Sequence, residues 1–300
     1  MRTTFLHNPA KGVDRGLTRE RLLAFADEAG LDAEWHHTKE EGLEAVLRRP
    51  ADLVVVAGGD GTVGDVLTRL PEDAPPVLIL PLGTANNVAH ALGLGGEPEA
   101  LIRDCRRLCP RPFDLGLIRG PWGERRFVEG IGLGLLARAA GDVNARSVAS
   151  RDKIPTGRRR LADLLETVRP FAPDARLDGA PLPRDVLLVE CLNIPFAGPA
   201  LRLTGGDPGD GLFEVALAGP MLRGDLRAWI EGGAEVEAPL DVRRGRRLVL
   251  VWSGTHLHLD DHFFDPPPAP TRIEVEVLPG AVRVLAPPSQ ESPRCLSPKP

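Results

Sequence analysis

The sequence predicts an α/β protein in which an N-terminal parallel-sheet domain is followed by a second, β-rich, sandwich-like domain. Leu53–Ala57 is a continuous apolar run, which is typical of a central parallel strand covered on both faces. Val63, Val66, Leu67 and Leu70 then recur at helical spacing. After residue 113 helices become sparse and strand-like stretches multiply, which favours a mainly antiparallel second domain.

Strand and helix patterns alternate through residues 1–112, which we assign to the first domain. Its predicted strands are Thr3–Leu6, Ala33–His37, Leu53–Ala57 and Val77–Leu80. Gly30 follows the first helix, where a left-handed cap is expected. Right-handed crossovers bring the carboxyl ends of these strands to one sheet edge, so the loops that follow them should lie together.

Residues 113–280 are predicted to form the β-rich domain, with a few helices between its strands. The predicted strands are Phe113–Arg119, Arg126–Gly132, Val186–Ile194, Leu212–Ala218, Leu248–Trp252, His256–Asp260 and Ile273–Leu278. Helical stretches are predicted near Leu135–Asn144, Arg158–Val168 and Leu222–Ile230. A last strand is expected at 281–286, and residues 287–300, rich in Pro and Ser, are predicted to be a disordered tail.

Composition excludes several classes of protein. The 300 residues carry a formal net charge of −5 and show no dominant basic stripe, which argues against a nucleic-acid partner. No segment has the length of a transmembrane helix or the pattern of a signal peptide. The four cysteines have no metal-like or disulfide-framework spacing, so we expect a reduced, cytoplasmic protein whose membrane contact, at the inner face, is peripheral. Nothing in the sequence indicates an oligomeric state.

The turn after the apolar run at 53–57 has the properties of an anion site. Gly58, Gly59 and Gly61 let a ligand approach the backbone, and the N-terminus of the next helix favours a phosphate. Asp60 lies at the apex of this turn. A carboxylate beside phosphate repels it unless the carboxylate binds a metal ion or transfers a proton. A simple hairpin at Asp60-Gly61 is the alternative, but the residues that follow have a helical period.

A second polar loop, Gly83–Asn87, follows the strand at 77–80. Its hydroxyl and amide groups suit a ligand at the same sheet edge. Thr84 is also a good helix N-cap, and the two roles do not exclude each other.

The sequence GGDGT after an apolar strand, with PLGTANNVAHALGL about one strand–helix unit later, resembles the diacylglycerol kinase catalytic-domain family. These lipid kinases are related to sphingosine kinases and NAD kinases. Asn8-Pro9, Phe113–Gly116 and the pattern from Thr156 to Leu165 extend the resemblance over most of the chain. It also implies that the strand at 281–286 returns to the first domain.

The resemblance implies ATP and Mg²⁺ as cofactors and a lipid substrate at the membrane surface. Asp60, Asp114 and His262 are the catalytic candidates, and Asp60 could act as a base or bind metal through water; Asp210 is the candidate metal ligand. From residue chemistry alone Asp114 reads as surface-facing, and Asp210-Gly211 as a turn. The implied nucleotide-binding residues are Asn8, Gly58, Gly59, Gly61, Thr62, Gly83, Thr84 and Asn86.

Two departures from the family pattern remove negative charge. Asn86-Asn87 stands where the family has Asn-Asp, and Asp260-Asp261-His262 where it has Asp-Gly-Glu. A neutral histidine can accept a proton near pH 7 but does not supply the fixed charge of a carboxylate. Catalysis is therefore less firmly implied than nucleotide binding.

Two further patterns have both functional and ordinary explanations. His256, His258 and Asp260 alternate with leucines, so one strand face carries three potential metal ligands, although a solvated polar face is the commoner outcome. The basic segment Arg151–Arg160 suits nucleotide phosphates or lipid head groups, or a solvated helix start.

These observations predict an ATP-dependent lipid kinase that phosphorylates a hydroxyl group of diacylglycerol or a related lipid. One alternative is a catalytically weakened nucleotide- or lipid-binding regulatory protein. The other is a kinase for a soluble substrate, similar to NAD kinase.

Overall fold

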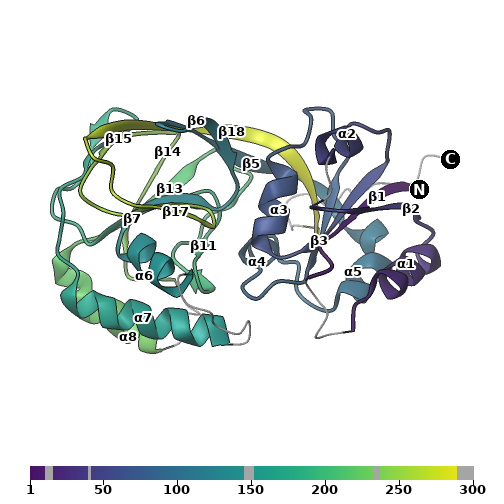
Figure 1. Ribbon diagram of the computed structural model, residues 1–300, viewed down its shortest axis with the longest axis horizontal. Helices are drawn as coiled ribbons and strands as arrows, with labels where there is room; N and C mark the ends of the chain where they lie inside the picture. The colour runs from purple at the N-terminus through teal and green to yellow at the C-terminus, as the bar shows by residue number, and fades with distance from the viewer. Residues whose placement is uncertain (11–15, 40–41, 145–151, 233–236, 289–300) are drawn as a thin grey trace. The chain divides into compact units, whose positions relative to one another are not determined.

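The computed structural model describes residues 1–288 apart from 11–15, 40–41, 145–151 and 233–236, and the polypeptide divides into two compact units (Figure 1). The first unit comprises Met1–Phe113 and the segment that begins at Gly280, and the second comprises Asp114–Pro279. The predicted tail at 287–300 lies almost entirely outside the described residues. Among the described residues, no helix is long and apolar enough to cross a membrane.

The first unit is built on a parallel sheet. Its strands are β1 (Arg2–His7), β2 (Asp32–His37), β3 (Leu53–Gly58), β4 (Val77–Pro81) and the end of β18 (Thr271–Ala286), in the order β2-β1-β3-β4-β18. All neighbouring pairs in this order are parallel. Every residue of β3 is buried, which explains why its sequence is apolar throughout instead of alternating.

Short helices connect these strands. They are α1 (Arg19–Glu28), α2 (Leu43–Leu47), α3 (Asp60–Leu67), α4 (Asn87–Ala91) and α5 (Pro98–Arg103), followed by the 3₁₀ turn η2 (Cys105–Arg107). The Thr18 hydroxyl caps α1, and Gly30 follows that helix with a φ of +69°, as predicted for a left-handed cap.

The second unit is a sandwich of two sheets. One sheet has the order β14-β13-β10-β7-β16-β17, and all its pairs are antiparallel. Its strands are β14 (Asp241–Gly245), β13 (Phe213–Ala218), β10 (Leu188–Leu192), β7 (Gly130–Gly134), β16 (Leu257–Leu259) and β17 (His262–Phe264). The facing layer consists of the first part of β18, β15 (Arg247–Trp252), β8 (Asp174–Leu177), β9 (Ala180–Pro181), β5 (Cys109–Gly120) and β6 (Gly123–Phe127), and through β18 it is continuous with the parallel strands in one ten-stranded sheet. Strands β11 (Phe196–Ala197) and β12 (Leu201–Arg202) form a small separate hairpin.

Alternation along the strands gives each face of the six-stranded sheet its own core. Val189 and Cys191 of β10 face the second sheet, where Leu248 and Leu250 of β15 meet them. Leu188 and Leu192 face the opposite way, toward helices that cover the outer face. These helices are α6 (Leu135–Asn144), α7 (Lys153–Thr167) and α8 (Arg223–Glu231), the last preceded by the 3₁₀ turn η4 (Pro220–Leu222). Helices α7 and α8 lie side by side (Figure 1).

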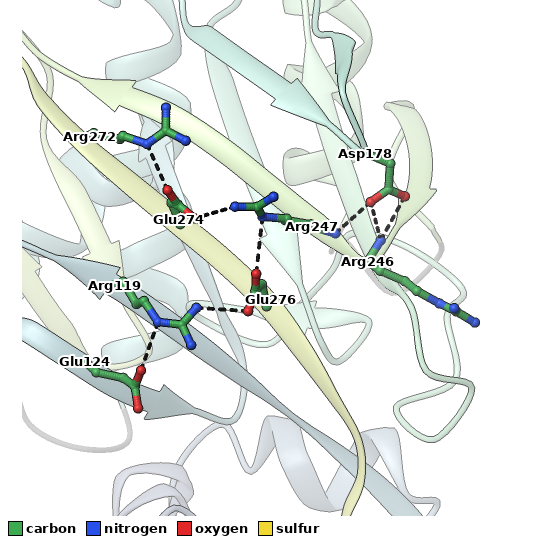
Figure 2. A network of polar contacts seen from close by, with 8 residues as sticks. All are labelled: Arg119, Glu124, Asp178, Arg246, Arg247, Arg272, Glu274 and Glu276. Carbon is green, nitrogen blue, oxygen red and sulfur yellow. Dashed lines mark hydrogen bonds and ion pairs between the residues drawn. The ribbon is translucent and has the colours of Figure 1, made fainter.

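The second sheet of this unit carries a ladder of ion pairs, which Figure 2 shows. The Arg119 guanidinium pairs with Glu124 of β6 and Glu276 of β18, both at 2.9 Å. Arg247 of β15 pairs with Glu274 at 2.6 Å and Glu276 at 3.2 Å. The register places Arg247 opposite Glu276 and Arg119 opposite Glu124, while Glu274 is the diagonal neighbour of Arg247. Because these side chains are partly exposed, each pair adds little stability.

Three details differ from the sequence-based expectations. Ile273–Leu278 and 281–286 are not separate strands but parts of the single strand β18, which continues through Pro279-Gly280. The predicted strand Arg126–Gly132 is interrupted and belongs to both β6 and β7. Cys105 and Cys191 are free thiols but Cys109 is disulfide-bonded, so the expectation of a fully reduced protein is wrong for that residue. The predicted fold class is otherwise confirmed.

Candidate active-site residues in the two units

The turn after β3 is built by close packing of glycines. Gly59 precedes α3 with an extended backbone, and Asp60 is the first residue of that helix instead of a loop apex. A Cβ atom on Gly58 would lie 2.6 Å from the Cβ of Thr62, so only glycine fits this position. The turn therefore directs the N-terminus of α3, with Asp60 and the exposed Gly61, toward the sheet edge.

The two predicted polar loops of the first unit touch through their glycines. A Cβ atom built on Gly83 would lie 2.6 Å from the Cα of Gly59, and the Leu82 N–H donates to the Gly58 carbonyl at 2.8 Å. A larger side chain at either glycine would force the loops apart. The backbones of the two loops are in direct contact, which confirms the expectation that these loops lie together.

Asn86 fixes the shape of the second loop. Its backbone is left-handed, with a φ of +52°, and its side-chain oxygen accepts from the Gly83 N–H at 2.8 Å while its amide donates to the Gly83 carbonyl at 3.1 Å. Helix α4 follows directly, with Asn86 as its N-cap residue. The predicted N-cap Thr84 is therefore wrong, and its side chain is exposed.

The Asp60 carboxylate links the two loops. Its Oδ1 atom accepts a hydrogen bond from the Val88 N–H at 3.1 Å. That N–H belongs to the first turn of α4, where helix geometry provides no internal partner. Asp60 is half-buried, so this carboxylate has both a structural partner and access to solvent.

Asn8 adds the loop after β1 to the same cluster. Its amide donates to the Thr62 hydroxyl at 3.1 Å, its own N–H donates to the Ala57 carbonyl at 3.0 Å, and its side chain is buried. The structure therefore brings Asn8 together with the two glycine loops and Asp60. With the glycines and Thr62, this cluster contains eight of the nine residues assigned to this unit. The ninth, Thr84, lies in the second loop with its side chain exposed.

Asp114, in the second unit, is a buried structural carboxylate. Only 1% of the residue is exposed, which corrects the surface-facing interpretation, and its Oδ2 accepts from the Gly211 N–H at 2.7 Å. The buried Asn193 amide donates to the Asp114 carbonyl at 2.8 Å and to the Val128 carbonyl at 2.9 Å. Asn193 was not singled out from the sequence, because its partners lie more than sixty positions away.

Asp210, the predicted metal ligand, has protein partners for both oxygens. Oδ1 accepts from the Leu212 N–H at 3.0 Å, and Oδ2 forms an ion pair with Arg244. A guanidinium at this position repels a cation, so the arrangement does not fit Mg²⁺. Within the described ranges no group of three or more His, Cys, Asp or Glu side chains could hold a metal. Mg²⁺ that is bound mainly by nucleotide phosphates needs only one or two carboxylates, a demand that Asp60 does fit.

Asp260 and Asp261 form the turn between β16 and β17, and His262 is the first residue of β17. The Asp260 carboxylate accepts the N–H groups of Val128, Glu129 and Gly130 at 2.9, 2.8 and 3.0 Å. Burial raises the pKa of this carboxyl, and the three backbone donors oppose the rise. His262 is exposed and directly follows the turn, so it is accessible to a ligand.

The predicted His256, His258 and Asp260 stripe is divided among separate partners. His256 lies 3.6 Å from Asp265 at the surface, whereas His258 Nε2 lies 2.7 Å from Oε2 of the buried Glu190. Asp260 binds backbone groups, so the three side chains do not form a metal site. Glu190 is a residue that sequence reasoning missed.

The basic segment Arg151–Arg160 lies partly outside the described residues. In its described part, the Arg158 guanidinium donates to the carbonyls of Pro199 and Ala200 at 3.4 and 2.9 Å. Arg158 therefore has an internal structural contact.

Residues 2–118 match the sequence model of the diacylglycerol kinase catalytic domain, which confirms the resemblance seen in the sequence. The diacylglycerol kinase of Mycobacterium tuberculosis is 29% identical over 263 residues, which are 84% of this chain and 82% of that protein. A probable lipid kinase YegS-like protein of Pseudomonas aeruginosa is 29% identical over 277 residues, 87% of this chain and 86% of its own length.

Solved structures agree on the fold. A putative diacylglycerol kinase from Bacillus anthracis superposes with a TM-score of 0.73 at 19% identity, over 96% of this chain and 98% of its own. Yeast NADH kinase, solved in complex with NADH, superposes with a TM-score of 0.52 at 12% identity, over 95% and 83% of the two chains. The same architecture thus occurs in kinases whose names indicate a lipid and a dinucleotide substrate.

Proposed function

We propose that the protein transfers the γ-phosphate of ATP to a hydroxyl group of diacylglycerol or a related lipid. The observation that carries this proposal is the pair of glycine loops joined at Gly59 and Gly83, with the Asp60 carboxylate beside them. Backbone N–H groups at the start of α3 suit phosphate oxygens, and the missing side chains let the nucleotide approach. The names of the sequence relatives support a lipid as the acceptor.

In this proposal Asp60 and His262 have different functions. Asp60 either holds Mg²⁺, directly or through water, or takes up the proton of the lipid hydroxyl group. When bound, the metal ion would neutralise charge that develops on the transferred phosphoryl group. His262 is the second proton acceptor, at the position where related kinases have a carboxylate, and its exposure leaves its imidazole free to reach a substrate.

Asp114 and Asp260 act in this proposal as structural residues. Both carboxylates are occupied by backbone N–H groups of their own unit. They therefore stabilise the second unit and do not touch the reacting atoms. Asp210 is a metal ligand only if the cation displaces Arg244.

The lipid acceptor implies contact with a membrane surface. We place that contact at the periphery of a bilayer, at its inner face if the protein is cytoplasmic.

The test is transfer of labelled γ-phosphate by the purified full chain to diacylglycerol, sphingosine and NAD, assayed separately with Mg²⁺. We expect the label in diacylglycerol or a related lipid. Label in NAD alone would instead identify a soluble-substrate kinase.

The loss of a carboxylate at His262 favours a second candidate, a nucleotide- or lipid-binding regulatory protein with weakened catalysis. ATP binding without transfer to any acceptor would support it over the kinase.

A further inference from the structure

A buried acid–base pair crosses the middle of the six-stranded sheet. Strands β10 and β16 flank β7, and the register places Glu190 of β10 and His258 of β16 on either side of Gly132. Glu190 is fully buried and His258 is 8% exposed. Their side chains meet over the central strand, with 2.7 Å between Glu190 Oε2 and His258 Nε2.

Gly132 makes this contact possible. A Cβ atom at Gly132 would lie 1.9 Å from Glu190 Oε2, so any other residue would push the carboxylate away. The pair shares its sheet face with Leu188 and Leu192, which pack under helices α6 to α8. An ionic contact in these apolar surroundings is costly to bury, and removal of either partner would leave the other charge uncompensated.

The His258 ring also forms a hydrogen bond with the turn that follows β16. The ring donates to the backbone carbonyl of Asp260, so its acceptors are a carboxylate and a carbonyl. Two acceptors suit the protonated ring, which has two donors. Burial opposes the charge, but attraction to Glu190 and these hydrogen bonds raise the pKa of His258.

Glu190 is the carboxylate that directly contacts the His258 ring. Glu190 Oε1 has no hydrogen-bond partner among the described residues. Strand β17 brings Phe263 and the exposed His262, and the carboxylates of Asp260 and Asp261 belong to the same hairpin. Helix α6 packs on β16 with buried Leu135, Leu136 and Ala139, while its Arg138 is exposed.

We propose that Glu190 and His258 are positioning residues that hold the Asp260-Asp261 turn, and with it His262, in the orientation needed for phosphoryl transfer. His258 holds the Asp260 carbonyl, and the Asp260 carboxylate binds the N–H groups at the start of β7. The turn is thus fixed from two directions, and His262 is the next residue along the chain. This inference deepens the proposed function and rests on it for the role of His262.

The pair also makes the stability of the protein depend on pH. Because the pKa of His258 is raised in the folded state, its stabilisation is complete below the unfolded value of about 6.5. The stabilisation is lost as pH rises through the folded-state pKa. The free energy of unfolding should therefore decrease on the alkaline side, where the His258 ring loses its proton and its attraction to Glu190.

The test is the variant Glu190→Gln, which keeps the shape of the side chain but removes its charge. Glu274→Gln, in the exposed ladder of the same unit, is the matched control. Histidine ring NMR across pH reports the titration of His258 and the environment of His262, with His258→Asn and His262→Asn used to assign the signals. Transfer kinetics are measured on the same proteins.

We expect Glu190→Gln to lower the titration midpoint of His258, to shift the ring signals of His262, and to reduce kcat about tenfold with an unchanged KM for ATP. Glu274→Gln should change none of these. An unmoved His258 midpoint would overturn the ionic pair, and unmoved His262 signals or an unchanged kcat would overturn the positioning role.

Two of these measurements, the NMR signals and the wild-type titration of His258, do not depend on the proposed function. If the wild type transfers no phosphate, the proposed function fails, while the NMR signals of His258 and His262 still decide the inference about the pair and the turn. If Glu190→Gln does not fold, the wild-type titration decides, because a His258 midpoint at or below ~6.5 contradicts the pair.

Discussion

The carboxylates of the two units differ in what binds them. In the first unit Asp60 is half-buried at a helix N-terminus and accepts the Val88 N–H through Oδ1. In the second unit Asp114 and Asp260 are buried and bind backbone N–H groups, and Asp210 pairs with Arg244. In the proposed function the same residue type therefore supplies ligand chemistry in one unit and structural stability in the other. Substitutions that separate turnover from stability test this difference.

The largest expected effect is on turnover, from Asp60→Asn. Asparagine can still accept the Val88 N–H, so thermal unfolding should be unchanged, but it can neither hold a metal ion with a charge nor accept a proton. We expect transfer to fall about 10²–10⁴-fold, the contribution of a positioned acid–base group. Asp65→Asn, on the exposed side of the same helix, is the control. Full turnover in a folded Asp60→Asn protein would remove Asp60 from the mechanism.

Asp260→Ala should have the largest effect on stability. It leaves three buried N–H groups without their acceptor, and it puts alanine at a φ of +48°. We expect a loss of more than about 3 kcal/mol in the free energy of unfolding, measured in urea. Asp261→Ala, at the exposed neighbour, should stay within about 0.5 kcal/mol. Equal losses in the two variants would argue against the anchoring role of the Asp260 carboxylate.

Asp114→Ala should destabilise less, by about 1–3 kcal/mol, because one buried donor, the Gly211 N–H, loses its partner. Asp114→Asn, which retains an acceptor oxygen, should lose only part of this amount. If Asp114→Asn keeps its stability but loses turnover, Asp114 is catalytic after all.

The smallest effect should come from Asp210→Asn. The ion pair with Arg244 is partly exposed, so its loss should cost less than about 1 kcal/mol. We also expect an unchanged Mg²⁺ concentration for half-maximal transfer. A tenfold increase in that concentration would establish Asp210 as a metal ligand in spite of Arg244.

Local patterns explain what could be predicted from the sequence. The parallel sheet, the two glycine loops and the cap at Gly30 follow from apolar runs and from residues with special backbone freedom. Asn8, Gly59 and Gly83 could be grouped because parallel strands end at one edge.

The remaining features depend on register and distant partners. The Glu190–His258 pair requires three strands to be aligned at Gly132, and Asp210 meets Arg244 across 34 positions. Pro279-Gly280 resembles a break between strands, although β18 continues through it. Thr84 has a typical capping side chain, but the left-handed Asn86 begins the helix instead.

The most direct test of the central claim is the affinity of the first unit's loops for ATP, measured by calorimetry on the full chain without any acceptor. The wild type should bind ATP with Mg²⁺, and Gly83→Ala should weaken binding at least about tenfold, because its Cβ would lie 2.6 Å from the Cα of Gly59 and separate the loops. Gly224→Ala, where a Cβ meets no atom within 4 Å, should bind like the wild type. A folded Gly83→Ala protein with unchanged affinity, or a wild type without affinity for ATP, would contradict the account.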